Sequence, residues 1–303
     1  MNQTLFYLGV AKELRSRSEN VEFITFHERS HHLIVNEGFK SFNFFSERRN
    51  NGSLNDYSPE KLVSYSKEYN IEPLNKYLGH EKAVFQLSDK VARSKFYSYI
   101  KTVDSFIDTL NSQDIIVQEL GGFFSCLSIH FIANKKKIKN YFLEPSFYRG
   151  RFFINPDLKA KQIVPSDNYE ENQEVLNYIK ATLEKSSIVI PTKDKHHYNG
   201  VLKKFFNFYN FRRLTEKIYD KLILGYEEEF RYIFLHFKKH LLLIYNKFQL
   251  KPLYHELTEF NKFIYYPLHV PADVSLTIRA THCYNQLYVL DLIARRSEER
   301  RVG

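Results

Sequence analysis

Residues 115–143 read IIVQELGGFFSCLSIHFIANKKKIKNYFL, and this stretch decides the fold. The β-branched run at 115–118 is typical of a buried strand, and the glycines at 121–122 mark a turn. Residues 123–133 predict a helix, and 140–143 predict another short strand. A strand, turn, helix and strand in this order form a βαβ unit, in which a crossover helix joins two parallel strands. The sequence therefore predicts an α/β fold.

The residues before this unit alternate in the same way. Residues 4–14 predict a helix, 21–26 (VEFITF) a strand, 30–37 a helix and 39–45 a strand. Such alternation favours a parallel sheet with crossover helices. A doubly wound domain opens with a strand, so we expect one strand to be missing in front of the first helix. Two further helices are expected at 59–69 and 88–110.

The pattern changes after residue 149. A helix is expected at about 170–185, and residues 193–251 then carry 13 Lys or Arg against 6 Asp or Glu, a net charge of +7 out of +9 for the chain. This aromatic, basic segment predicts two or three helices, which we interpret as an insertion. Strand character returns at 263–266, and a helix follows at about 284–295. The expected divisions are a Rossmann-like domain at 1–165, the insertion at 166–260, the start of a second domain at 261–296, and an extraneous tail at 297–303.

Composition excludes several classes of protein. Hydrophobic residues make up 43% and charged residues 26% of the 303 residues, which is typical of a globular chain. No apolar run reaches the roughly 18 residues that a membrane span needs, and no secretory leader precedes the first helix. Two cysteines, Cys126 and Cys283, are too few for a disulfide framework. We therefore expect a cytoplasmic protein.

Candidate site residues follow two of the predicted strands. Glu119 ends the first strand directly before Gly121 and Gly122, at the sheet edge where ligands of α/β folds bind. Glu144 follows the next strand, and two carboxylates at adjacent strand ends suit a general base or nucleophile and its partner. For Glu119 the alternative is a tight turn with a solvated side chain.

Two arginines follow Glu144 along the chain. Arg149 and Arg151 could grip a phosphate or a carboxylate with two parallel hydrogen bonds each. Ordinary ion pairs in a surface loop are the alternative interpretation, which we favour slightly for Arg151 and not for Glu144.

The third candidate is a loop with two prolines, YPLHVPAD at residues 266–273. Pro267 and Pro271 stiffen this loop and so fix the directions of His269 and Asp273 at a low entropic cost. The stretch FIYYPLHVPADVSLTIRATH, with Gln286 after it, resembles the loop that opens the nucleotide-sugar domain of capsule polysaccharide biosynthesis proteins. GVAKELRSR, VEFITF, QELGG and LEPS are similar to the front part of the same family, which includes capsule Kdo transferases.

This resemblance implies a GT-B architecture of two Rossmann-like domains, with the acceptor on the first and the nucleotide-sugar on the second. It implies a glycosyltransferase that uses a nucleotide-sugar donor, CMP-Kdo among the candidates, and a glycan or lipid-linked acceptor. Glu119 would be the catalytic carboxylate, and His269, Asp273 and Gln286 would lie at the cleft. The later donor-binding motifs, a Lys-x-His-Pro strand end and a Ser- and Gly-containing helix start, are not in this sequence. We therefore expect these 303 residues alone to be inactive.

The basic segment and the histidines allow other interpretations. The basic helices could contact anionic lipid at the inner face of the cytoplasmic membrane, or simply form a helical insertion with a solvated basic face. A pI of about 9.2 with interleaved aromatic residues also fits a nucleic-acid-binding protein. No RNP, KH or helix-turn-helix pattern supports that alternative, so no nucleic-acid partner is expected. No Cys or His spacing matches a zinc site, so no metal and no cofactor are expected either.

Overall fold

The computed structural model describes residues 2–51, 56–145, 152–159, 172–185, 208–229, 233–253, 266, 268–270 and 273–302. Their contacts divide the chain into two units. Unit 1 comprises Met1–Ala160, Tyr226–Leu235 and Leu253–Gly303, and unit 2 comprises Lys161–Gly225 and His236–Pro252.

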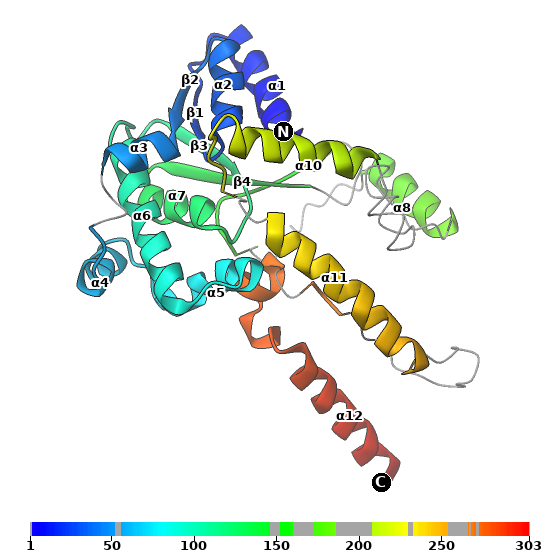
Figure 1. Cartoon of the computed structure of the whole chain (residues 1–303). Coiled ribbons are helices and arrows are strands. Elements are labelled where there is room, and N and C mark those ends of the chain that lie inside the picture. The colour runs from blue at the N-terminus through cyan, green and yellow to red at the C-terminus, as the bar shows by residue number, and fades with distance from the viewer. Residues whose placement is uncertain are drawn as a thin grey trace. The chain divides into compact units, whose positions relative to one another are not determined.

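Strands and helices alternate through the first half of unit 1 (Figure 1). Their order is α1 (Asn2–Ser16), β1 (Glu22–Thr25), α2 (Glu28–Asn36), β2 (Lys40–Asn43), α3 (Phe44–Asn50), α4 (Pro59–Glu68), α5 (Leu74–Phe85), α6 (Asp89–Ile107), β3 (Ile115–Glu119), α7 (Phe124–Lys135), β4 (Lys139–Pro145) and β5 (Phe152–Asn155). The predicted α/β class is confirmed.

The first sheet has two parallel strands, β1 and β2, joined by α2. Leu8, Ala11, Ile34 and Phe39 form its small buried core between α1, α2 and the sheet. The strand predicted at 39–45 ends two residues earlier in the structure, because the Asn43 side chain accepts hydrogen bonds from the N–H groups of Phe45 and Ser46 and caps α3. The aromatic residues Phe44 and Phe45 favour a strand, but the cap at Asn43 places them in a helix instead.

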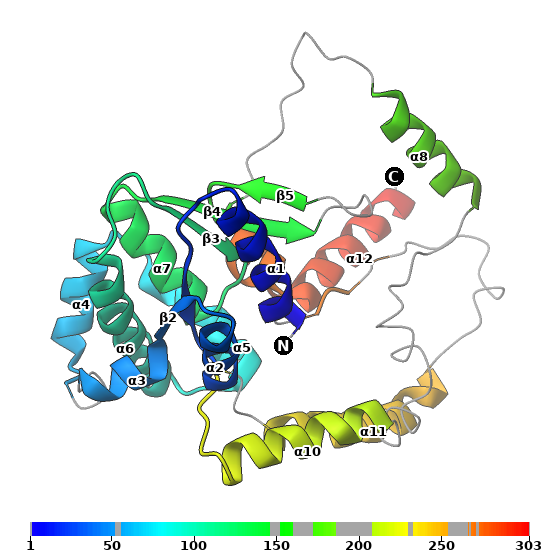
Figure 2. The same ribbon diagram turned by 90° about the horizontal axis from the view of Figure 1, so that it is seen from above.

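The second sheet has the order β3-β4-β5, with β5 as the outer arrow (Figure 2). β3 and β4 pair in parallel across the crossover helix α7, as the βαβ pattern predicted. No strand was predicted at β5, which pairs with β4 in the antiparallel direction, so the second sheet is mixed and not purely parallel. Six residues separate β4 from β5, and a parallel connection needs a dozen or more.

A core of aromatic rings holds α3, α6 and α7 together. Tyr99 of α6 lies at the centre, with its ring 4.3 Å from the Phe44 ring and 6.1 Å from the Phe124 ring. Phe96 packs 4.8 Å from Phe124 on the same helix pair. All four side chains are at most 1% exposed. Such rings bury 150–250 Å² each, so this cluster dominates the apolar burial that orients α7.

Further features of unit 1 were not predicted. Helix α5 carries little apolar periodicity, and the sequence reading left it out. The π-helix η4 (Ser275–Arg279) packs against α5, although residue 261 was expected to open a separate domain. After the short η5 (Thr281–Cys283), α12 runs from Gln286 to Val302, so the residues expected to break this helix continue it.

Unit 2 contains α8 (Gln173–Lys185), α10 (Phe208–Leu222), the short η2 (Lys251–Leu253) at the boundary, and most of α11 (Ile233–Leu250). Phe211, Leu214, Ile218 and Leu222 are exposed at a spacing of three and four residues along α10. α10 is therefore amphipathic. The short apolar run at 188–190 and all but the last residue of the strand at 263–266 lie outside the described residues. Among the residues that are described, no helix is long and apolar enough to cross a bilayer.

Candidate functional site

The turn between β3 and α7 packs directly on His80 of α5. A methyl group added at Gly122 would lie 2.4 Å from Cγ of His80, and one added at Gly121 would lie 3.0 Å from Sγ of Cys126. Real Cβ atoms do not approach other atoms as closely as the first of these distances. Packing within the chain thus explains why both positions hold glycine. The approach of a ligand, which the sequence suggested, is not needed to explain them.

His80 joins this turn to the loop that the sequence singled out. Its Nδ1 lies 2.9 Å from Oγ1 of Thr277, and this hydroxyl donates to the backbone oxygen of Asp273 at 2.9 Å. Since the hydroxyl proton is used, Nδ1 must carry the proton and donate to Thr277. The structure therefore brings together the turn at Gly122 and the loop at Asp273.

The other ring nitrogen of His80 faces the protein interior. His80 is 3% exposed, and its Nε2 has no hydrogen-bond partner among the described residues. Burial lowers the pKa of His80 to about 4, and the Asp273 carboxylate opposes this shift. His80 is therefore neutral near pH 7, and its unpaired nitrogen is a hydrogen-bond acceptor.

Two other predicted residues meet at the exposed part of the loop. The backbone N–H of His269 donates to Oε1 of Gln286 at 2.7 Å, and Nε2 of Gln286 donates back to the His269 carbonyl at 2.9 Å. Asp273 accepts a hydrogen bond from the N–H of Ser275 at 2.7 Å, which starts the π-helix η4. Gln286 thus holds the backbone of His269, and the exposed imidazole remains accessible.

Glu119 and Glu144 lie at neighbouring strand ends but on opposite faces of the sheet. The parallel register aligns Glu119 with Leu143, so Glu144 points to the other face. The side chain of Gln3 in α1 donates to the Glu119 carboxylate, which is exposed. The two carboxylates therefore have separate partners, and they do not face each other as an acid and base pair would.

Glu144 belongs to an ion pair with the π-helix. Arg279 donates to both oxygens of Glu144, and Asn155 of β5 donates to Oε1 at 2.6 Å. Both charged side chains are about one-fifth exposed, so this pair is partly shielded from water. Glu144 anchors η4 to the edge of the sheet. Arg149 and Arg151 lie outside the described residues.

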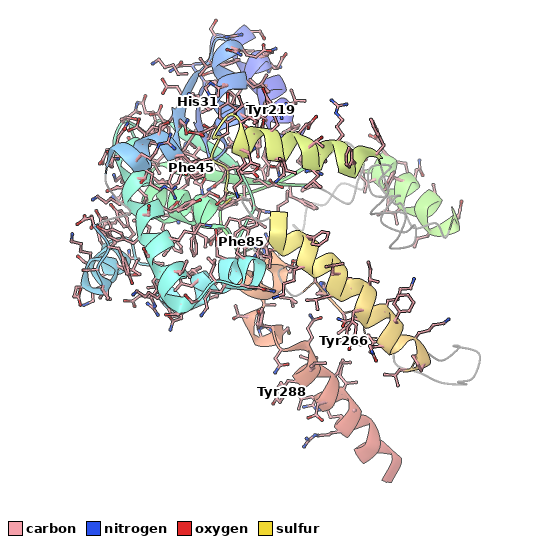
Figure 3. All side chains as sticks on the ribbon, in the orientation of Figure 1. His31, Phe45, Phe85, Tyr219, Tyr266 and Tyr288 are labelled. Carbon is pink, nitrogen blue, oxygen red and sulfur yellow. The ribbon has the colours of Figure 1, made fainter. Side chains whose placement is uncertain are left out.

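Sequence reasoning missed a buried cluster of charged residues at the first turn of α7. Oε1 of Glu81 accepts a hydrogen bond from the N–H of Phe124 at 3.1 Å, and its Oε2 lies 2.6 Å from Nζ of Lys95. The hydroxyl of Ser125 donates to Oε2 of Glu229 at 2.9 Å, and the Ser125 N–H also bonds this carboxylate. Two carboxylates from distant segments therefore cap one helix. The ammonium of Lys95 also lies 4.7 Å from the ring centre of Phe85, which is labelled in Figure 3.

The sequence contains one sign of this cluster, at the start of α7. α7 begins at Phe124, and its N-cap residue Phe123 has no side chain that can accept a hydrogen bond. A helix that lacks Ser, Thr, Asp or Asn at its N-cap needs another partner for its first N–H groups. The sequence could show this need. It could not show which glutamates meet it.

Burial dominates the electrostatics of this cluster. It raises the pKa of Glu81, and it raises the pKa of Glu229 to about 7, with a further rise from the charge of Glu81. The Lys95 ammonium opposes both shifts. The neighbouring Tyr99 and Cys126 also have raised pKa values, mainly because they are buried. Near neutral pH both the protonated and the ionised forms of Glu229 are thus populated.

Comparison of the chain with models of protein families, with curated proteins and with solved structures found no match. The functional interpretation therefore rests on the residues and on their geometry.

Proposed function

We propose that the chain is a glycosyltransferase of capsule or surface polysaccharide synthesis, which transfers a sugar from a nucleotide-activated donor to a glycan or lipid-linked acceptor. Unit 1 would be the acceptor side of a two-domain GT-B enzyme. The hydrogen bond between His80 and Thr277 is the main structural support, because it joins the turn after β3 to the loop of His269 and Asp273. These two segments carry the resemblance to capsule biosynthesis proteins.

The chemistry of the residues at this edge suits a sugar. In α/β sheets, ligands bind beyond the carboxyl ends of the strands, where Glu119 ends β3. An exposed carboxylate can accept the proton of a sugar hydroxyl as this hydroxyl attacks the donor, and Glu119 is our candidate for this general base. The departing nucleotide carries phosphate, which Arg149 and Arg151 would stabilise. Contact with the inner face of the membrane belongs to the same proposal.

Binding is the test that suits this chain. Saturation-transfer NMR with a panel of oligosaccharides and nucleotide-sugars should detect at least one glycan on the purified protein. Glu119→Gln should weaken the signal of that glycan, whereas Glu13→Gln should leave it unchanged, since Glu13 pairs with Arg17 on the surface of α1. His269→Ala should weaken it as well, with an unchanged circular dichroism spectrum.

Two results would count against the proposal. One is the absence of any glycan signal together with tight binding of a single-stranded oligonucleotide, which would favour the nucleic-acid alternative. The other is wild-type glycan binding in both the Glu119→Gln and the His269→Ala proteins.

A further inference from the structure

Three consecutive glutamates interrupt the basic segment and belong to unit 1. We call Tyr226–Glu229 the acidic strap. The N–H of Glu28 donates to the carbonyl of Glu227 at 3.0 Å, and the N–H of Glu229 donates to the carbonyl of Phe26 at 3.1 Å. His27 and Glu228 pair between them in the antiparallel direction. The strap thus pairs with the residues that directly follow β1, at the carboxyl end of this strand.

Each glutamate of the strap has a partner that recognises anions. Glu227 lies 2.9 Å from Nη1 of Arg49 and 3.4 Å from Nη2 of Arg48. Oε2 of Glu228 lies 3.1 Å from Nε2 of His27. Glu229 occupies the first turn of α7, through the Ser125 contacts described above. Two guanidinium groups, an imidazole and a helix N-terminus therefore receive three carboxylates in a row.

One carboxylate of the strap, that of Glu229, is buried unfavourably. Glu229 is 8% exposed, and its Oε1 has no hydrogen-bond partner among the described residues. The carboxylate also lies close enough to the buried Glu81 for the charge of Glu81 to disfavour its ionised form. A buried carboxylate oxygen without a hydrogen-bond partner is unfavourable, because burial removes its hydrogen bonds to water and nothing replaces them. Gly225, with φ of +65°, immediately precedes the strap. Release of the strap would return the Glu229 carboxylate to water and remove this unfavourable burial.

We propose that the acidic strap occupies a binding site for a carboxylate-bearing glycan, and that such a glycan displaces it. Side chains of Glu227 and Glu229 project to the same side of an extended chain, roughly 7 Å apart. Successive acidic sugars offer carboxylates at a comparable spacing. The proposal rests on the proposed function, because it names the class of acceptor that this edge would take.

The probe is tri-galacturonic acid, a trisaccharide with one carboxylate on each sugar. Its affinity is measured by isothermal titration calorimetry for the wild type and for the variant Glu227→Gln/Glu228→Gln/Glu229→Gln. If the strap covers the site in about 90–99% of the molecules, its release raises the apparent affinity about 10- to 100-fold. The further changes Arg48→Ala and Arg49→Ala should remove this gain.

Matched controls separate charge from position. The variant Glu13→Gln/Glu60→Gln/Glu68→Gln changes the net charge by the same amount as the strap variant, but on α1 and α4. It should bind tri-galacturonic acid like the wild type. The affinity for maltotriose, a neutral trisaccharide, should rise less on loss of the strap than the affinity for tri-galacturonic acid does. Inorganic phosphate distinguishes a general anion site: an equal gain for phosphate would overturn the assignment to a glycan.

A measurement on the wild type covers the case in which the strap variant does not fold. Tri-galacturonic acid should speed hydrogen exchange at the N–H groups of Glu28 and Glu229, whose acceptors are Glu227 and Phe26 across the strap contact. Unchanged exchange at saturating tri-galacturonic acid would overturn displacement. Binding of maltotriose without any effect of the strap changes would refute this inference and leave the proposed function standing. Absence of all glycan binding would instead refute the proposed function.

Discussion

Replacement of Gly122 by alanine gives the sharpest test of the packing that joins the β3 turn to η4. The new Cβ would lie 2.4 Å from Cγ and 2.8 Å from Cβ of His80, so the imidazole must move. Overpacking of a filled interior costs about 1–3 kcal/mol. Loss of the buried hydrogen bond to Thr277 costs about 1–3 kcal/mol more. We expect Gly122→Ala to lower the free energy of unfolding by about 2–6 kcal/mol.

The measurement is urea denaturation of the purified chain followed by far-UV circular dichroism. Gly79→Ala is the matched control, because Gly79 also lies in unit 1 and a methyl group there would meet nothing within 4 Å. Alanine in the middle of α5 should be neutral or stabilise by up to about 1 kcal/mol.

A double-mutant cycle assigns the cost to His80. In a His80→Gly background the added methyl group meets neither the ring nor Cβ of residue 80, so Gly122→Ala should cost less than about 1 kcal/mol. An equal cost of Gly122→Ala in both backgrounds would refute the packing explanation. So would a Gly122→Ala protein as stable as the wild type.

Three further predictions concern the charged cluster and the loop. Lys95→Met leaves the fully buried Glu81 uncompensated and should destabilise the protein by about 3–5 kcal/mol in urea denaturation, with most of the loss recovered by Glu81→Gln/Lys95→Met; a loss as large in the double variant would contradict this. The raised pKa of Glu229 contributes stability that is fully present below about 4.5 and lost as the pH rises to about 7, so Glu229→Gln should gain stability relative to the wild type between these values; a constant difference across the range would show that Glu229 does not titrate there. Gln286→Ala removes both hydrogen bonds to the His269 backbone and should speed hydrogen exchange at the His269 N–H, and an unchanged rate would contradict the observed pairing.

The stability of Glu229→Gln must be compared with that of the wild type at the same pH, because buried histidines change the stability of both proteins with pH in the opposite direction. Burial lowers the pKa of His80 and of His130 to about 4. Their contribution to stability is present above about 6.5 and is lost as the pH falls toward 4. The difference between the wild type and Glu229→Gln cancels this background.

The sequence by itself determined the local order of elements. The β-branched run at 115–118, the glycine pair and the apolar helix after it predict β3, the turn and α7, because each depends on the conformational preference of nearby residues. Local information also identified His269 and Asp273 as parts of one loop, and the resemblance to capsule polysaccharide biosynthesis proteins added Gln286 after it. Hydrogen bonds within and across that region join them in the structure.

Tertiary structure alone decided which distant groups satisfy one another. Helix α5 has weak periodicity, so its His80 and Glu81 could not be assigned to the β3 turn in advance, and the strap lies more than 100 residues from the Ser125 that it contacts. The pleat of the sheet, set by the register of β4 against β3, separated Glu119 from Glu144. Local preferences fix the conformation of a segment, whereas the partners of a buried charge or of an uncapped helix end depend on contacts that no short stretch of sequence contains.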